Sequence, residues 1–231
     1  MGSTRRRPDV VSGPLGYDSA VATGKGDDGT TGLLFGGDRI AKDDARAEAY
    51  GTIDEAVAAL GLARAELGLK QQYGVIPVGM AGLAELILRF QRELFVVAAE
   101  LASNPDAWSR LEEGRTKVSA EMVTGLDDVL RETEGHLEMP TEFVVPGETR
   151  TSAAIELART IIRRAERRAV TLDRLGQVPG PHLLPYLNRL ADLLWVLARA
   201  AERADARPAT PARTGRRRAS ATDTDTDGAD R

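Results

Sequence analysis

The 231-residue chain contains no cysteine and only two histidines, His136 and His182. Without cysteine there are no disulfide bonds, no thiolate metal sites and no cysteine nucleophiles. Two histidines are too few for a histidine-rich metal site or for a di-iron site with paired histidines. The sequence therefore offers no ligands for a metal site based on cysteine or histidine.

Long apolar runs and a strong excess of one charge are also missing. No apolar run approaches the roughly 18 residues needed to span a bilayer, and nothing resembles a secretory signal. The formal net charge is only −4, and both signs are interspersed, which argues against general nucleic-acid binding. We expect a soluble, cytoplasmic protein that binds neither membrane nor nucleic acid.

The composition fits one domain with two tails. Hydrophobic residues make up 42% of the chain, which is enough for a sizeable core. Residues 1–20 show no periodicity and should form a disordered arm, whereas residues 204–231 are a low-complexity tail almost without large apolar side chains. The folded domain should therefore occupy residues 21–203.

Between the tails the dominant pattern is helical. Apolar residues recur at helical spacing in five segments, 43–67, 80–101, 119–137, 151–175 and 183–203. No segment alternates with period two for long enough to form a sheet. The sequence predicts an all-α protein, a five-helix bundle preceded by an ordered glycine-rich N-terminal segment.

The fourth segment carries a dense cationic face. At about 100° per residue, Arg159, Arg163, Glu166 and Arg167 fall on one side of a helix, opposite a set of apolar residues. Arginine presents a fixed fork of donors that matches phosphate oxygens, so this face could clamp a polyphosphate. The alternative interpretation is a solvated face with ion pairs along the helix.

The segment TGKGDDGTTG, residues 23–32, precedes the first helix. Its glycines permit turns that aim successive N–H groups at an anion, and its threonines and Lys25 add hydroxyls and a positive charge. It is not a Walker A loop, because the lysine precedes the required spacing and no strand is expected. A phosphate cradle and a flexible surface turn both fit this composition.

Four further residues could contribute to a site. Asn188 and Asp192 lie one turn apart on the fifth segment and could bind ribose or base, or hold an arginine, although a solvated face fits equally. Asp54 lies at the edge of the apolar stripe of the first helix. Phe143 lies in the loop FVVPGET before the arginine helix, where a phenylalanine is more often a plug of the core than a ligand contact.

Taken together, these segments resemble the PduO-type ATP:cob(I)alamin adenosyltransferases. The resemblance rests on GDDGTTGL at 26–33, KDDARAEAYGTIDE at 42–55, FVVPG at 143–147, SAAIELARTIIRRAER at 152–167 and YLNRLADLLWVLAR at 186–199. These motifs occur in the order and spacing of the family over residues 21–203, which makes the set far more specific than any one motif.

The resemblance implies a homotrimer with active sites between neighbouring subunits, which bind ATP with Mg²⁺ and a corrinoid. It implies ATP contacts from Thr23, Gly24, Lys25, Gly26, Thr30, Thr31 and Lys42 of one subunit and from Arg163, Arg164, Glu166, Arg167 and Asn188 of the next. It further implies that Asp54 and Arg159 pair across the interface, that Phe143 lies under the corrin and displaces its lower ligand, and that Asp192 is an active-site acid.

The implied chemistry is attack by Co(I) on the 5′ carbon of ATP, which forms adenosylcobalamin and releases triphosphate. Because the metal electron pair is the nucleophile, the protein needs no nucleophile or general base of its own. Its tasks are to position the reactants and to stabilise charge on the leaving group. An adenosylcobalamin-dependent enzyme is a candidate acceptor of the product.

Two departures from the family pattern leave an alternative open. Lysine at Lys25 stands one place later than in the usual motif, so that Gly24 takes its position, and Glu148 replaces a common glycine. The alternative is therefore a module that binds ATP or a corrinoid, or delivers the cofactor, without turnover. A purely structural bundle would not require arginines and glycines in this register.

Overall fold

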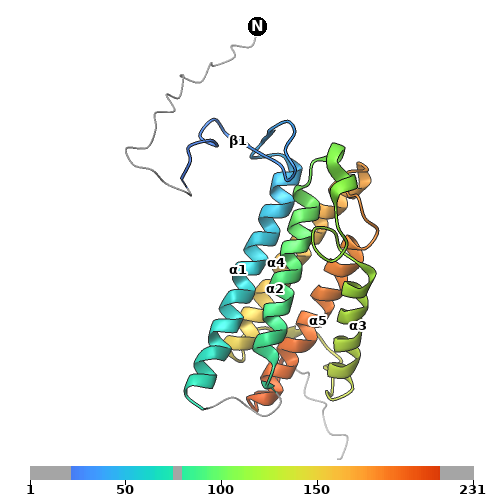
Figure 1. Cartoon of the computed structure of the whole chain (residues 1–231). Coiled ribbons are helices and arrows are strands. Elements are labelled where there is room, and N and C mark those ends of the chain that lie inside the picture. The colour runs from blue at the N-terminus through green and yellow to red at the C-terminus, as the bar shows by residue number, and fades with distance from the viewer. Residues whose placement is uncertain (1–21, 75–79, 214–231) are drawn as a thin grey trace, which may run out of the picture.

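The computed structural model describes residues 22–74 and 80–213. In this part of the chain five long helices form a bundle in which successive helices run in opposite directions (Figure 1). The helices span Ala45–Gln72 (α1), Leu83–Ala102 (α2), Ala120–Glu134 (α3), Arg150–Arg174 (α4) and Leu183–Ala204 (α5), with a short 3-10 helix at Pro105–Arg110 (η2). The predicted all-α, five-helix architecture is confirmed.

Side chains cap the helices where the sequence offers them. Asp44 accepts a hydrogen bond from the Arg46 N–H at 2.8 Å, and Ser119 caps α3. Thr149 and Ser152 form a reciprocal capping box at the start of α4. These caps satisfy N–H groups that have no partner inside the helix, and they fix where the loops enter the bundle.

Helix α1 continues past residue 67, where the sequence predicted its end. Leu67 is buried in the core, and Lys70 in the last turn forms an ion pair with Asp205 just beyond α5. These two contacts outweigh the cost of Gly68 in a helix, about 1 kcal/mol relative to alanine.

Helix α5 lies in the middle of the bundle. It packs against α3 and α4, while α1 packs against α2 and α4. Its leucine stripe is fully buried, at Leu187, Leu190 and Leu194. Burial of apolar surface contributes about 25 cal/mol per Å², so this stripe stabilises the fold strongly. The apolar residues that recur at helical spacing in segment 183–203 thus form the inward face of this helix.

Buried charges tie the loops at the end of the bundle where α1 begins. Arg46 donates to the carbonyls of Leu101 and Gln177 at 2.7 and 3.1 Å. The Glu100 carboxylate accepts from the Val118 N–H at 2.7 Å, and burial raises its pKa. This end of the fold is therefore held by hydrogen bonds to the backbone.

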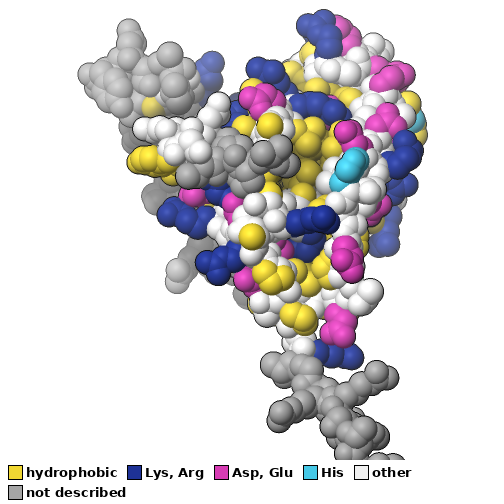
Figure 2. Space-filling model, turned by 90° about the horizontal axis from the view of Figure 1, so that it is seen from below, with side chains coloured by type: hydrophobic (Ala, Val, Ile, Leu, Met, Phe, Trp, Pro, Cys, Tyr) yellow, Lys and Arg dark blue, Asp and Glu magenta, His cyan; other side chains and the backbone are white. Residues whose placement is uncertain are grey.

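An apolar hollow lies at the opposite end. Figure 2, which views this end, shows hydrophobic side chains gathered between charged ones. A cavity of about 730 Å³ is lined here by residues of α2, α3 and α5, among them Leu86, Val129 and Leu197.

Four two-residue strands lie in the segments outside the helices and form two antiparallel pairs. β1 (Thr30–Thr31) pairs with β2 (Ile40–Ala41), and β3 (Val144–Val145) pairs with β4 (Thr210–Pro211). The second pair corrects the predicted boundary of the C-terminal tail. Residues 205–207 form backbone hydrogen bonds to the end of α5, and residues 210–212 form them to the loop before α4. These interactions need no large apolar side chain. Residues 1–21 and 214–231, where the rest of both predicted tails falls, lie outside the described residues.

Candidate active site

The glycine-rich segment forms a compact turn ahead of α1. Gly24 and Gly29 have positive φ angles of 69° and 81°, which favour glycine. The Asp27 N–H donates to the Gly24 carbonyl and the Gly29 N–H to the Gly26 carbonyl, both at 3.1 Å. A side chain on Gly26 would come within 2.9 Å of the Lys42 amine. The structure thus brings Lys42 against the turn. A phosphate cradle formed by residues 23–31 and Lys42 would require this contact, and we call this set of residues the cradle.

Arg39 closes this cradle, although no motif in the sequence marks it as a site residue. Its guanidinium donates to the Thr30 hydroxyl at 2.7 Å and to the carbonyls of Lys25 and Thr30 at 2.8 and 3.0 Å. Asp28 accepts from the Thr30 hydroxyl, and this bond lowers the pKa of Asp28. The consecutive glycines Gly36 and Gly37 are the sequence feature that indicates a turn here. This turn brings Arg39 back past the cradle.

The arginines of α4 divide between two sides of the helix. Arg164 pairs with Glu55, and Arg168 pairs with Glu48 at 3.3 Å, so both face α1. Arg163 is exposed on the side of α5, and Arg167 is exposed and donates to the Arg163 carbonyl at 3.0 Å. Only part of the predicted cluster is therefore open to an anion in the single chain.

A hollow between α3, α4 and α5 gathers several predicted site residues. Arg159, Arg163, Asp192 and Trp195 are among the residues that line this hollow of about 320 Å³. Close by, the Glu166 carboxylate accepts from the Asn188 amide at 3.3 Å. Two arginines and two carboxylates, Asp192 and Glu134, thus share one small hollow, and the arginines can hold an anionic group there.

A larger cavity of about 650 Å³ adjoins this hollow, because Arg159 and Trp195 line both. The loop before α4 contributes Phe143, whose side chain is 89% exposed. The interpretation of Phe143 as a plug of the core is therefore wrong. An exposed aromatic ring beside a cavity is suited to contact a large flat ligand.

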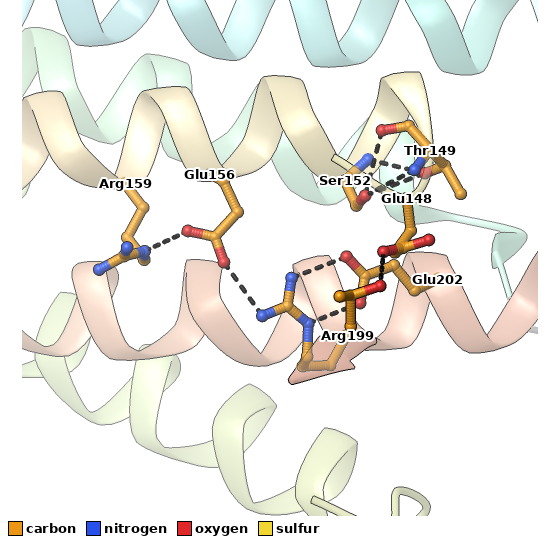
Figure 3. Close-up of polar contacts among 8 residues, drawn as sticks. Glu148, Thr149, Ser152, Glu156, Arg159, Arg199 and Glu202 are labelled. Atoms are coloured by element: carbon orange, nitrogen blue, oxygen red, sulfur yellow. Dashed lines mark hydrogen bonds and ion pairs between the residues drawn. The ribbon is translucent and has the colours of Figure 1, made fainter. Parts of the chain in front are cut away.

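Buried ion pairs lie beneath this cavity (Figure 3). Arg199 of α5 is 4% exposed and stands between Glu202, at 2.7 Å, and Glu156 of α4, at 3.2 Å. Glu156 in turn accepts from Arg159 at 2.6 Å. We call these four side chains the buried ion network. Two arginines face two glutamates, so the network is neutral, and it fixes Arg159 at the boundary of the two hollows.

The predicted residues form two groups in one chain. Among the described residues, no hydrogen bond or ion pair joins the cradle to the arginines of α4, and Figure 1 shows the β1 segment outside the bundle. Asp54 is exposed on α1, and Arg159 pairs with Glu156 rather than with Asp54. The single chain therefore does not bring these two groups of residues together.

Within residues 22–74 and 80–213, no cluster of three or more acidic, histidine or cysteine side chains could hold a metal ion. No helix in the described part of the chain has the length and apolar character to cross a bilayer.

Comparison with known proteins assigns the chain to a family. The cobalamin adenosyltransferase family model matches residues 21–201, and the chain therefore belongs to that family. It is 36% identical over 182 residues to a corrinoid adenosyltransferase of Citrobacter freundii, covering 79% of this chain and 94% of that protein.

Solved structures agree. A PduO-type ATP:corrinoid adenosyltransferase from Lactobacillus reuteri, a variant with histidine in place of a phenylalanine and complexed with cobalamin and ATP, superposes with a TM-score of 0.71 and 26% identity. The match covers 84% of this chain and 96% of that one. Another variant of that enzyme, with lysine in place of an arginine and complexed with ATP, gives a TM-score of 0.68 at 26% identity, covering 82% of this chain and 98% of that one.

The buried ion network predicts that replacing two different arginines of α5 lowers the free energy of unfolding by unequal amounts. Arg199→Met leaves Glu156 and Glu202 buried without their common partner, and we expect a loss of about 3 to 5 kcal/mol in the free energy of unfolding. Arg189→Met is the control, because Arg189 pairs with Asp127 at 2.7 Å in an exposed position and should cost about 0 to 1 kcal/mol. Urea unfolding measures both, and similar losses would contradict the structural role of the network.

Proposed function

We propose that this chain catalyses transfer of the 5′-deoxyadenosyl group of ATP to cob(I)alamin, forming adenosylcobalamin and triphosphate. The observation that carries the proposal is the hollow lined by Arg159 and Arg163, which shares a wall with the cavity beside Phe143. Two adjoining spaces, one suited to an anion and one to a flat ring system, match two substrates that must meet at one carbon atom.

The proposed reaction needs positioning rather than acid–base chemistry. The electron pair of Co(I) forms the bond to the 5′ carbon, and the carbon–oxygen bond breaks with its electrons leaving on triphosphate. Arg163, Arg167 and Lys42 supply fixed positive charge where the leaving group gains negative charge, which lowers the barrier. Asn188 and the turn at residues 23–31 supply neutral donors for the nucleotide.

Mg²⁺ should enter with ATP, because it binds preferentially through phosphate oxygens and water with few protein ligands. Phe143 should occupy the lower face of the corrin and keep a lower ligand from the cobalt. Its exposed ring at the cavity supports this role. Asp192, in the hollow with Arg163, can orient that arginine or accept from the nucleotide.

We further propose that the active site is completed by a second subunit in a homotrimer. The cradle and the arginines lie apart in one chain, and α1 and α4 carry an exposed apolar strip suited to a subunit interface. The ion pairs Arg164–Glu55 and Arg150–Glu66 set the register of the two antiparallel helices. Leu62 and Leu157, level with one another in that register, are each 49% exposed.

The alternative function is a module that binds ATP and corrinoid, or delivers the cofactor, without turnover. Incubation of the full-length chain with ATP, Mg²⁺ and reduced cobalamin distinguishes the two, because adenosylcobalamin has its own absorption spectrum. We expect conversion with release of one triphosphate per corrinoid. Binding of both ligands without conversion would support the alternative. The adenosylcobalamin-dependent acceptor of the product stays a prediction.

Replacement of Arg163 tests the triphosphate clamp. Arg163→Ala should remove about 1.5 to 3 kcal/mol of charge-assisted bonding, or roughly one to two decades in ATP affinity or turnover. Arg168→Ala, five residues further along α4 and turned toward Glu48, is the matched control and should change the kinetics little. Near wild-type kinetics in Arg163→Ala would show that Arg163 does not bind the triphosphate.

A double-mutant cycle tests the pair between subunits. If Asp54 of one subunit binds Arg159 of its neighbour in a buried interface, loss of either partner costs about 3 to 5 kcal/mol, against about 0 to 1 for an exposed pair. Asp54→Asn and Arg159→Ala should each impair conversion or assembly, and the double variant should be less than additive. Because Arg159→Ala also removes a partner of Glu156, Asp54→Asn should be the milder change. Strict additivity in intact trimers would show that the two residues act separately.

A further inference from the structure

The chain that follows α5 returns to the cavity beside Phe143. Val145 pairs with Thr210 and Val144 with Pro211, and the Ala212 N–H donates to the Phe143 carbonyl at 2.7 Å. Residues 210–212 therefore lie alongside the loop that carries Phe143, and the next residue, Arg213, lines the same cavity.

A second bond links the two segments through Glu148, one of the residues that depart from the family pattern. The Thr210 hydroxyl donates to the Glu148 carboxylate. Glu148 therefore has its hydrogen-bond partner in the segment after α5. The ladder and this bond together hold the backbone just before Arg213.

The charges around the cavity leave Arg213 available to an outside anion. Four charged side chains line it, at Glu142, Glu156, Arg159 and Arg213. Glu156 is buried and shared between Arg159 and Arg199. No carboxylate among the described residues pairs with Arg213, and its side chain is exposed at the cavity rim.

We propose that Arg213 binds the phosphodiester of the corrinoid and thereby selects complete corrinoids over those that lack the nucleotide loop. This inference rests on the proposed function. Cobalamin carries its phosphodiester on the nucleotide loop, which hangs from the lower face of the ring, the face assigned to Phe143. Cobinamide has the same ring and no such loop. A guanidinium that lines the same cavity as Phe143 is therefore placed to bind the group that only one of the two corrinoids carries.

Measurement in the Co(I) state separates the effect of the nucleotide loop from the effect of the lower ligand. Four-coordinate Co(I) holds no lower ligand in either substrate, so the two corrinoids differ in the loop and its phosphodiester rather than in coordination. Selectivity measured with cob(I)alamin and cob(I)inamide thus reports on contacts to the loop.

The test compares Arg213→Gln with wild type in the full-length chain, with KM measured for both corrinoids at saturating ATP. We expect KM for cob(I)alamin to rise about tenfold, since one charge-assisted contact is lost, while KM for cob(I)inamide and for ATP stay unchanged. Arg213→Lys should lose less, because it keeps the charge but not the fork.

Arg207→Gln is the matched control. Arg207 is an exposed arginine of the same segment, but it lines a different cavity with Leu137 and Glu202. The variant Arg207→Gln should leave KM for cob(I)alamin and KM for cob(I)inamide unchanged. A parallel rise for both corrinoids in Arg213→Gln, or no rise for either, would overturn the assignment while the wild-type activity stands. Absence of conversion of either corrinoid by the wild type would instead refute the proposed function, and this inference with it.

Discussion

The arginine buried between two glutamates is the interaction on which the site side of the bundle depends. Arg199 and Glu202 belong to α5 and Glu156 to α4, so the ion pairs fix the rotation of the two helices against each other. Apolar side chains alone tolerate sliding and repacking, whereas a buried charge strongly penalises any shift that removes its partner. Through Glu156 the same constraint extends to Arg159, which separates the two hollows.

A second constraint comes from the topology. The cradle precedes α1, and the exposed arginines lie on α4 toward α5. No hydrogen bond or ion pair among the described residues joins the two groups. A site built from both groups therefore belongs to the proposed assembly, in which each chain would contribute to two sites.

The sequence predicted the parts of the fold that depend on local periodicity. The helix count and the leucine stripe of α5 both follow from spacing along one helix. Helix ends were less predictable, because Lys70 depends on Asp205, far away in the sequence. For the site, residue types and motifs identified Arg163, Asp192 and Phe143, and the structure places all three at adjoining hollows.

What the sequence did not predict depends on contacts between distant segments. Arg199 has helical spacing that groups it with exposed Asp192, and only the approach of Glu156 from another helix explains its burial. Arg39 becomes part of the cradle through a hairpin, and residues 204–213 become ordered through a ladder to the Phe143 loop. Low apolar content predicted disorder for that segment, because it measures what side chains can bury and not which backbone groups can pair.

The ladder between β3 and β4 also bears on the order in which the molecule folds. Its two strands are separated in the chain by the whole of α4 and α5, so they can meet only after both helices have folded back on the bundle. Long-range closures of this kind form late and, being short, open at low cost. The segment bearing Phe143 should thus be the last part of the fold to be fixed during synthesis and the first to be released, while the helices beneath it remain intact.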